Sequence, residues 1–192
     1  MCVLGCSVTS PISDLAVAPI ASDLVLCLTA EMAKVPNPPS ESPRIVCLRP
    51  GDRVDLLMSS TEDECCSGLA WVRFVRMYPS AQGKFPAQDG RVTPCDVMRW
   101  AVVFELGTVR CAPIGTTESI PTCDQWTDVT LNTYDDLAAI RRALCCYTAS
   151  NTDRLIMQGM AEPLTTEGGC TGVAMLVTIT APACDCQEAS TL

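Results

Sequence analysis

The chain has 192 residues, the length of one ordinary domain with a substantial hydrophobic core. Hydrophobic residues make up 48% of it and charged residues 18%, which excludes an intrinsically disordered chain. The formal net charge is −9, from 13 Lys and Arg against 22 Asp and Glu. This balance opposes a surface that binds nucleic-acid phosphates, because such binding needs clustered cations.

Cysteine is abundant and histidine is absent, with 14 Cys and no His. Without imidazole, the sequence excludes histidine-based acid–base catalysis, Cys–His nucleophiles and zinc sites that need histidine. An all-cysteine zinc site stays open as an alternative. The cysteine doublets at 65–66 and 145–146 and the C-x-C pair at 184–186 fit it poorly, because zinc knuckles have two to four intervening residues. We therefore expect no metal and no cofactor.

The N-terminal region indicates where the protein is made. Residues 1–33 contain no Lys or Arg, so the basic start of a signal peptide is missing and synthesis in the cytoplasm is predicted. The most apolar window, residues 15–30, is interrupted by Pro19 and Asp23. It is also shorter than the roughly 20 residues that a membrane span requires. No membrane-spanning helix is predicted.

The first predicted helix covers residues 22–35. Leu24, Cys27 and Leu28 share one face of it, and Ser22 is suitably placed as its N-cap. The proline-rich segment 36–43 cannot continue the helix and is predicted to be a loop.

Three strands follow in the prediction. Residues 44–48 form a short one before a turn at 49–52, and residues 69–78 form one that is mostly covered on both faces. Residues 97–106 alternate most cleanly, with Arg99 and Glu105 pointing away from the core. The residues expected to point inward there are Met98, Trp100, Val102, Phe104 and Leu106.

A second helix is predicted over residues 133–149. Thr133 followed by Asp136 resembles a capping box, and Asp135 and Asp136 would complement the helix macrodipole in the first turn. The inward face carries Leu137, Ile140, Leu144 and Tyr147. A glycine turn at 167–172 then leads into a β-branched strand at 173–180.

These elements predict an α+β fold in which two main helices pack on an antiparallel β-sheet. We expect a single domain over residues 22–186, with an N-terminal arm at 1–21 and a C-terminal tail at 187–192.

The cysteines are interpreted as structural. Adjacent side chains in a strand face opposite ways, and adjacent side chains in a helix lie about 100° apart, so neither doublet is suited to act on one centre. A disulfide from the 145–146 doublet to Cys170, Cys184 or Cys186 is expected from the order of the elements. The structural cysteines are predicted to be Cys65, Cys66, Cys111, Cys145, Cys146, Cys170, Cys184 and Cys186.

No catalytic constellation emerges from the sequence. The segment after Pro50 lacks the lysine and the spacing of a phosphate-binding loop, and Gly168-Gly169 is typical of a turn. We expect no enzymatic activity. The candidate interface residues are Arg73, Arg76, Arg141 and Arg142.

Five segments carry a resemblance to a known family. They are "ECCSGLAWVRFVRMYPS", "ELGTVRCAP", "DDLAAIRRALCC", "EGGCTGVAMLVTIT" and a terminal "CDC", in that order between about Ser22 and Cys186. In these motifs the chain resembles a cysteine-rich virion protein family of long-tailed (siphovirus-type) actinobacteriophages. Its members belong to the head-to-tail junction and are usually taken as tail terminators.

The resemblance implies a small α+β subunit that assembles as a hexameric ring at the neck of the virion. Such a ring caps the tail tube, with the major tail tube protein below it and the head-closure protein above, and DNA passes through its lumen without sequence-specific binding. Loops at 36–43, 79–96 and 112–132 would supply contacts, and disulfides would stiffen the particle outside the cell.

Other functions stay open. A head-closure (stopper) or adaptor protein of the neck is the nearest alternative. A secreted disulfide-rich binding module and a redox or zinc-binding protein are less favoured.

Overall fold

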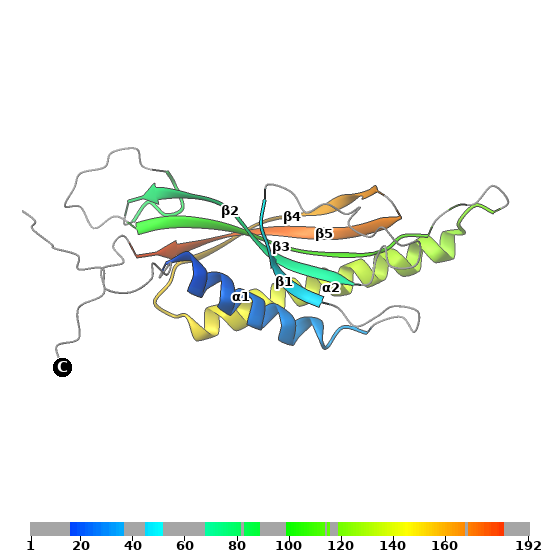
Figure 1. The fold of residues 1–192 in the computed structure, drawn as a ribbon, viewed down its shortest axis with the longest axis horizontal. Helices are drawn as coiled ribbons and strands as arrows, with labels where there is room; N and C mark the ends of the chain where they lie inside the picture. Colours follow the sequence, from blue (N-terminus) through cyan, green and yellow to red (C-terminus); the bar gives the residue numbers. More distant parts are fainter. Residues whose placement is uncertain are drawn as a thin grey trace, which may run out of the picture.

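A computed structural model describes residues 16–36, 45–51, 68–81, 83–88, 99–113, 115, 119–167 and 169–182. The described part is α+β, as the sequence predicts, with two helices and a five-stranded sheet (Figure 1). In chain order the elements are α1 (Val17–Met32), β1 (Ile45–Arg49), β2 (Leu69–Ser80), β3 (Arg99–Cys111), α2 (Cys123–Ser150), β4 (Ile156–Glu167) and β5 (Cys170–Ala181).

The sheet is mixed, so the expected purely antiparallel sheet is wrong at one edge. Its strand order is β1-β2-β3-β5-β4, and β1 runs parallel to β2 while the other three pairs are antiparallel. A parallel pair needs a connection long enough to return the chain to the same end of the sheet. The connection between β1 and β2, residues 50–68, has this length, and no local sequence pattern shows which way it returns.

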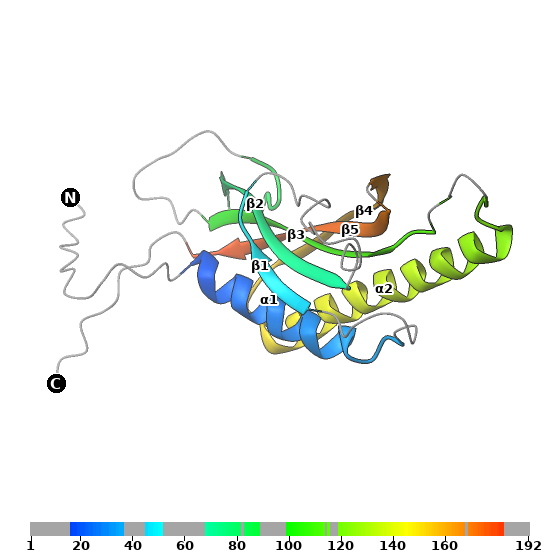
Figure 2. The same ribbon diagram turned by 45° about the vertical axis from the view of Figure 1, so that its right-hand side comes forward.

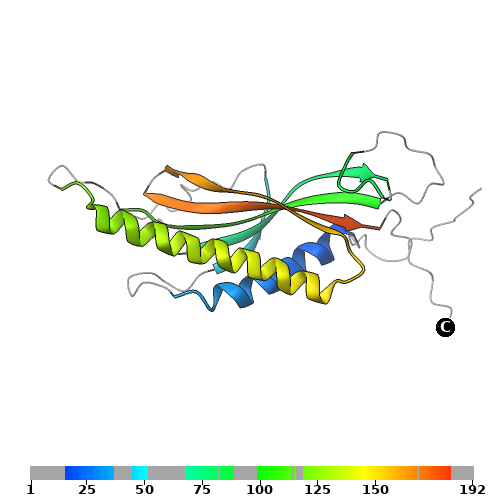
Figure 3. The same ribbon diagram turned by 180° about the vertical axis from the view of Figure 1, so that it is seen from behind.

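Both helices lie on one face of the sheet and pack against each other, as the views from the side and from behind show (Figures 2 and 3). Inward-facing apolar side chains of both helices and of β2, β3 and β5 form the main core between the layers. The expected alternation in β3 is confirmed, since Val102, Phe104 and Leu106 are buried in this core and Trp100 packs against it. Met98 lies outside the described residues.

Helix α1 begins at Val17, so the prediction of an N-cap at Ser22 is wrong. Ile20 and Ala21 are buried and extend the apolar face toward the N-terminus. Pro19 does not prevent this, because it lies in the first turn, where backbone N–H groups have no partner inside the helix.

Helix α2 begins at Cys123 and not after Thr133, so the predicted cap there is also wrong. Thr122 is the N-cap and forms a capping box with Gln125, whose side chain accepts from the backbone N–H of Thr122. Thr133 is inside the helix, where its hydroxyl donates to the carbonyl of Val129.

Strand β4 was not predicted. It forms one edge of the sheet and its pairing with β5 is interrupted between Gln158 and Ala161 and again between Leu164 and Glu167. These bulges and Pro163 limit pairing of the edge with another chain. They also break the alternation by which a strand is recognised in a sequence.

Candidate functional site

A buried ion pair joins the end of β3 to α2. Arg110 donates from Nε to Oδ2 of Asp136 at 2.7 Å and from Nη2 to Oδ1 at 2.9 Å. Thr108 adds a hydroxyl contact to Oδ2 at 3.3 Å. The two charged side chains are only 1% and 0% exposed. Burial raises the pKa of Asp136 to about 6, and Arg110 limits that rise.

This position of Asp136 corrects the prediction that it complements the helix dipole. With α2 beginning at Cys123, Asp135 and Asp136 lie in mid-helix, beyond the reach of the N-terminal partial charge. Asp135 is exposed, whereas Asp136 is the first buried residue of the helix. The ion pair therefore marks where α2 first contacts the rest of the molecule closely.

The N-terminal part of α2, residues 123–135, contains no buried residue and is called the α2 overhang here. Its end projects past the strands (Figure 3). Trp126, Leu131 and Tyr134 are 41%, 55% and 61% exposed on it. The overhang thus presents large apolar side chains that the described part of the chain leaves open to solvent.

The end of the sheet that lies away from the α2 overhang is basic. It is called the β2–β3 end here and comprises the described residues 74–81, 83–88, 99 and 100. Arg76 lies over the ring of Tyr78, 5.6 Å from its centroid, and the Tyr78 hydroxyl donates to the carbonyl of Pro86 at 2.9 Å. Phe74 and Met77 are also exposed, but their pairing with Phe104 and Val102 places them on the helix side of the sheet, the face opposite to Arg76 and Tyr78. Arg76, a candidate interface residue, is therefore exposed on the sheet face away from the helices, next to the Tyr78 ring.

Another candidate interface residue, Arg73, is engaged within the subunit. Its guanidinium makes a two-pronged contact with Glu105, at 3.0 Å from Nε and 2.6 Å from Nη2. The indole N–H of Trp71 donates to the same carboxylate at 3.0 Å. Although burial opposes it, these donors hold the pKa of Glu105 below its ordinary value.

The ring of Trp71 crosses the neighbouring strand at Gly107. A Cβ atom at that position would lie 2.2 Å from Cζ2 of the indole, so only glycine leaves room for the ring. The sheet face away from the helices is therefore covered locally by Trp71, packed with Val109 and Ala174.

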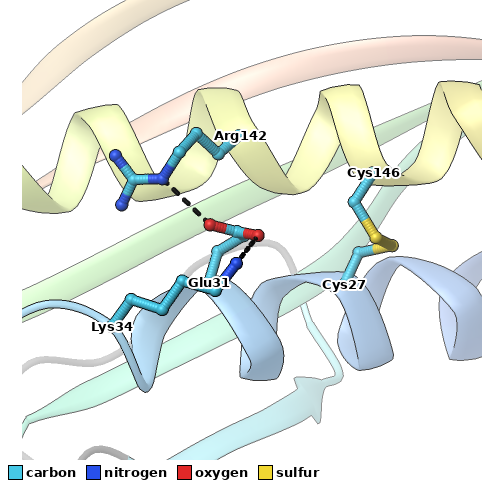
Figure 4. Close-up of polar contacts among 5 residues, drawn as sticks. All are labelled: Cys27, Glu31, Lys34, Arg142 and Cys146. Carbon is cyan, nitrogen blue, oxygen red and sulfur yellow. Dashed lines mark hydrogen bonds and ion pairs between the residues drawn. A yellow bond between two sulfur atoms is a disulfide. The ribbon is translucent and has the colours of Figure 1, made fainter.

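One disulfide joins the two helices, between Cys27 and Cys146, whose Cα atoms are 5.8 Å apart (Figure 4). The expectation that Cys145 or Cys146 pairs with Cys170, Cys184 or Cys186 is wrong, because Cys146 pairs with Cys27 and Cys145 is a free thiol. Cys27 lies on the apolar face of α1, where sequence analysis assigned it a packing role only. The signal that was missed is that two amphipathic helices on one sheet face bring their inward cysteines together.

The other predicted structural cysteines have varied positions. Cys145 is an exposed thiol on α2. Cys111 and Cys170 stand directly opposite each other at the ends of β3 and β5. Cys65, Cys66, Cys184 and Cys186 lie outside the described residues.

Beside the disulfide, Glu31 of α1 contacts two cations (Figure 4). Arg142 of α2 donates from Nε at 2.9 Å, and Lys34 lies 2.5 Å away. These hydrogen bonds, Lys34 first, lower the pKa of Glu31. Arg142, a candidate interface residue, thus links the two helices, whereas Arg141 is exposed on the outer side of α2.

The described residues contain no group of three or more cysteine or carboxylate side chains placed to hold a metal ion. None of the helices in the described part has the length and apolar character needed to cross a membrane. No protein-family model matches the chain, and no curated protein matches it significantly.

Proposed function

We propose that the chain is a structural virion protein, a tail terminator that assembles as a ring, hexameric in related cases, at the top of a long phage tail. It would cap the tail tube, bind the head-closure protein on its other side and leave a lumen for DNA. The motif resemblance supports this family and this biological setting.

The observation that carries the proposal is the α2 overhang. Monomeric proteins rarely expose several large apolar side chains together, and such groups mark sites of protein contact. Trp126, Leu131 and Tyr134 lie within three turns of one helix and are all well exposed. A subunit that assembles has a use for such a surface.

The charge of the chain supports the same function. With a net charge of −9, the surface repels DNA phosphates. A neck ring must let DNA pass without retaining it, because retention would slow both packaging and ejection. An acidic wall meets that need.

Two experiments test the proposal. Immunogold labelling of purified particles of a phage that encodes this chain should place the label where the tail meets the head. Particles without label would overturn it. In the second, purified protein is added to tubes of the major tail protein and examined by negative-stain microscopy. Capping of one tube end supports the terminator, whereas binding to the head connector with uncapped tubes favours the stopper.

A matched pair of variants sharpens the capping assay. Leu131→Asp places a charge in the α2 overhang, and Leu26→Asp places one at an exposed leucine of α1. We expect L131D to lose capping by about tenfold or more and L26D to retain it, because only the first alters the proposed contact surface. Equal capping by the two variants would remove the overhang from the function.

A further inference from the structure

The α2 overhang is acidic as well as apolar. Residues 111–140 contain no Lys or Arg at all. Their carboxylates are Glu118, Asp124, Asp128, Asp135 and Asp136. Asp124, Asp128 and Asp135 are exposed on the overhang itself, next to its apolar side chains.

The β2–β3 end has the complementary charge. Its described residues carry Arg76, Lys84 and Arg99 and include no carboxylate. Over the whole sequence from 74 to 100, the cations are Arg76, Lys84, Arg91 and Arg99 and the acids are Asp89 and Asp96. Arg76 and Arg99 lie on the sheet face away from the helices, whereas the exposed Phe74 and Met77 of the same end lie on the helix side.

The two surfaces lie at opposite ends of the molecule (Figure 1). Strand β3 runs from Arg99 at the basic end to Cys111, from which the chain leads to the start of α2. Its 13 residues span roughly 40 Å at the rise of a β-strand. One copy cannot bring its own overhang to its own β2–β3 end.

We propose that the α2 overhang docks on the β2–β3 end of a second copy of this chain. The inference rests on the proposed function only for the expectation that the assembly closes into a ring. The aspartates of the overhang face Arg76, Lys84 and Arg99 there, so opposite charges meet across the contact.

The alternative of two overhangs packed together is opposed by charge. Such a contact would bring three exposed aspartates of each copy together without a cation on either side. The contact between an overhang and a β2–β3 end is heterologous. Each copy in a bound pair therefore still has one of these two surfaces open to a further copy. Repetition of such a contact gives a ring when the rotation closes.

Charge reversal tests the contact. The double variants D128K/D135K and R76E/K84E should each weaken self-association by about tenfold or more, measured by sedimentation velocity over a range of concentrations. An equimolar mixture of the two variants should regain association, since a reversed overhang then meets a reversed β2–β3 end. E162K, at an exposed carboxylate in the middle of β4, should associate like the unchanged protein. Unaltered association in both double variants would overturn the proposal.

Cross-linking gives a second test that does not depend on weakening the contact. A photoreactive benzoylphenylalanine replaces Leu131, and chains of two isotopic compositions are mixed before irradiation. Mixed-isotope cross-links to residues 74–88 or 99–100 are expected. Cross-links to another overhang, or only within one chain, would overturn the contact. The proposed function is judged separately by particle labelling and tube capping, so a ring built through other surfaces would leave it standing.

Discussion

Arg110 and Asp136 form a two-pronged ion pair that is almost completely removed from solvent. The pair joins the C-terminal end of β3 to the middle of α2, and it is the first buried contact that the long helix makes. Isolated buried charges are costly, so each member depends on the other.

Removal of Arg110 should destabilise the protein strongly. In R110M the Asp136 carboxylate stays buried without its cation, and we expect a loss of about 3 kcal/mol in the free energy of unfolding. The pKa of Asp136 should rise above its present value of about 6, because the attraction that limits it is gone. Urea denaturation and carboxyl-carbon NMR titration measure the two effects.

The matched control is R141M, which changes an exposed arginine of the same helix and should be nearly neutral. The double variant R110M/D136L should regain most of the lost stability, since it leaves no unpaired charge. Equal stability of R110M and the unchanged protein would show that the pair contributes nothing.

Stability should depend on pH through Asp136. Its pKa in the folded protein, about 6, is above the ordinary 3.8, so the folded state holds a proton that the unfolded state has released between these values. This contribution to stability is complete below pH 3.8 and is lost as pH rises through about 6. From pH 5 to pH 7 the free energy of unfolding should fall by about 1 kcal/mol on this account.

The dependence of the free energy of unfolding on pH is best measured above pH 5. The lowered pKa values of Glu31 and Glu105 keep both groups ionised there, and their opposite effect is confined to more acid conditions. Chemical denaturation of D136N should lack the slope seen in the unchanged protein. A slope that persists in D136N would assign it to another group.

Loss of the disulfide between the helices should lower stability. Cys27 and Cys146 are 119 residues apart in sequence, so the bond restricts the unfolded chain considerably. We expect C27A/C146A to lose about 2–4 kcal/mol in urea denaturation. C145A alters the neighbouring exposed thiol and should change stability little. A loss in the double variant no larger than that in C145A would contradict this role.

A methyl group at Gly107 should disturb the covered patch on the open face of the sheet. In G107A the new Cβ would overlap the Trp71 indole, which must then move away from Glu105. A loss of about 1–3 kcal/mol is expected from overpacking, together with a change in tryptophan fluorescence. G115A is the control, because its Cβ would have no neighbour closer than 3.4 Å.

Local patterns predicted the parts of this fold that local physics determines. The alternation in β3 identified Val102, Phe104 and Leu106 as core residues because one face of that strand is covered by helices. The helical face with Ile140, Leu144 and Tyr147 was identified for the same reason. The start of α2 was not predicted, although Thr122 and Gln125 match the pattern of a capping box. The helix was recognised from its inward apolar face, and the exposed overhang has no such face.

Tertiary relationships were not accessible in this way. The partner of Cys146 depends on how α1 crosses α2, and cysteine pairing cannot be deduced from spacing alone. Burial of Asp136 depends on Arg110 arriving from another element, and an acid in a helix usually faces water. The parallel pairing of β1 likewise follows from the path of a long connection.

Helix α2 is continuous over 28 residues, or about 40 Å at the rise of an α-helix. Trp126 and Cys146 therefore belong to one stiff rod, with Asp136 between them. A force on the exposed end is transmitted along the helix to the disulfide with α1. The helix is continuous between Trp126 and Cys146, so no hinge separates them. Mechanical load applied to the projecting end of the subunit would therefore reach a sulfur–sulfur bond as well as weaker contacts.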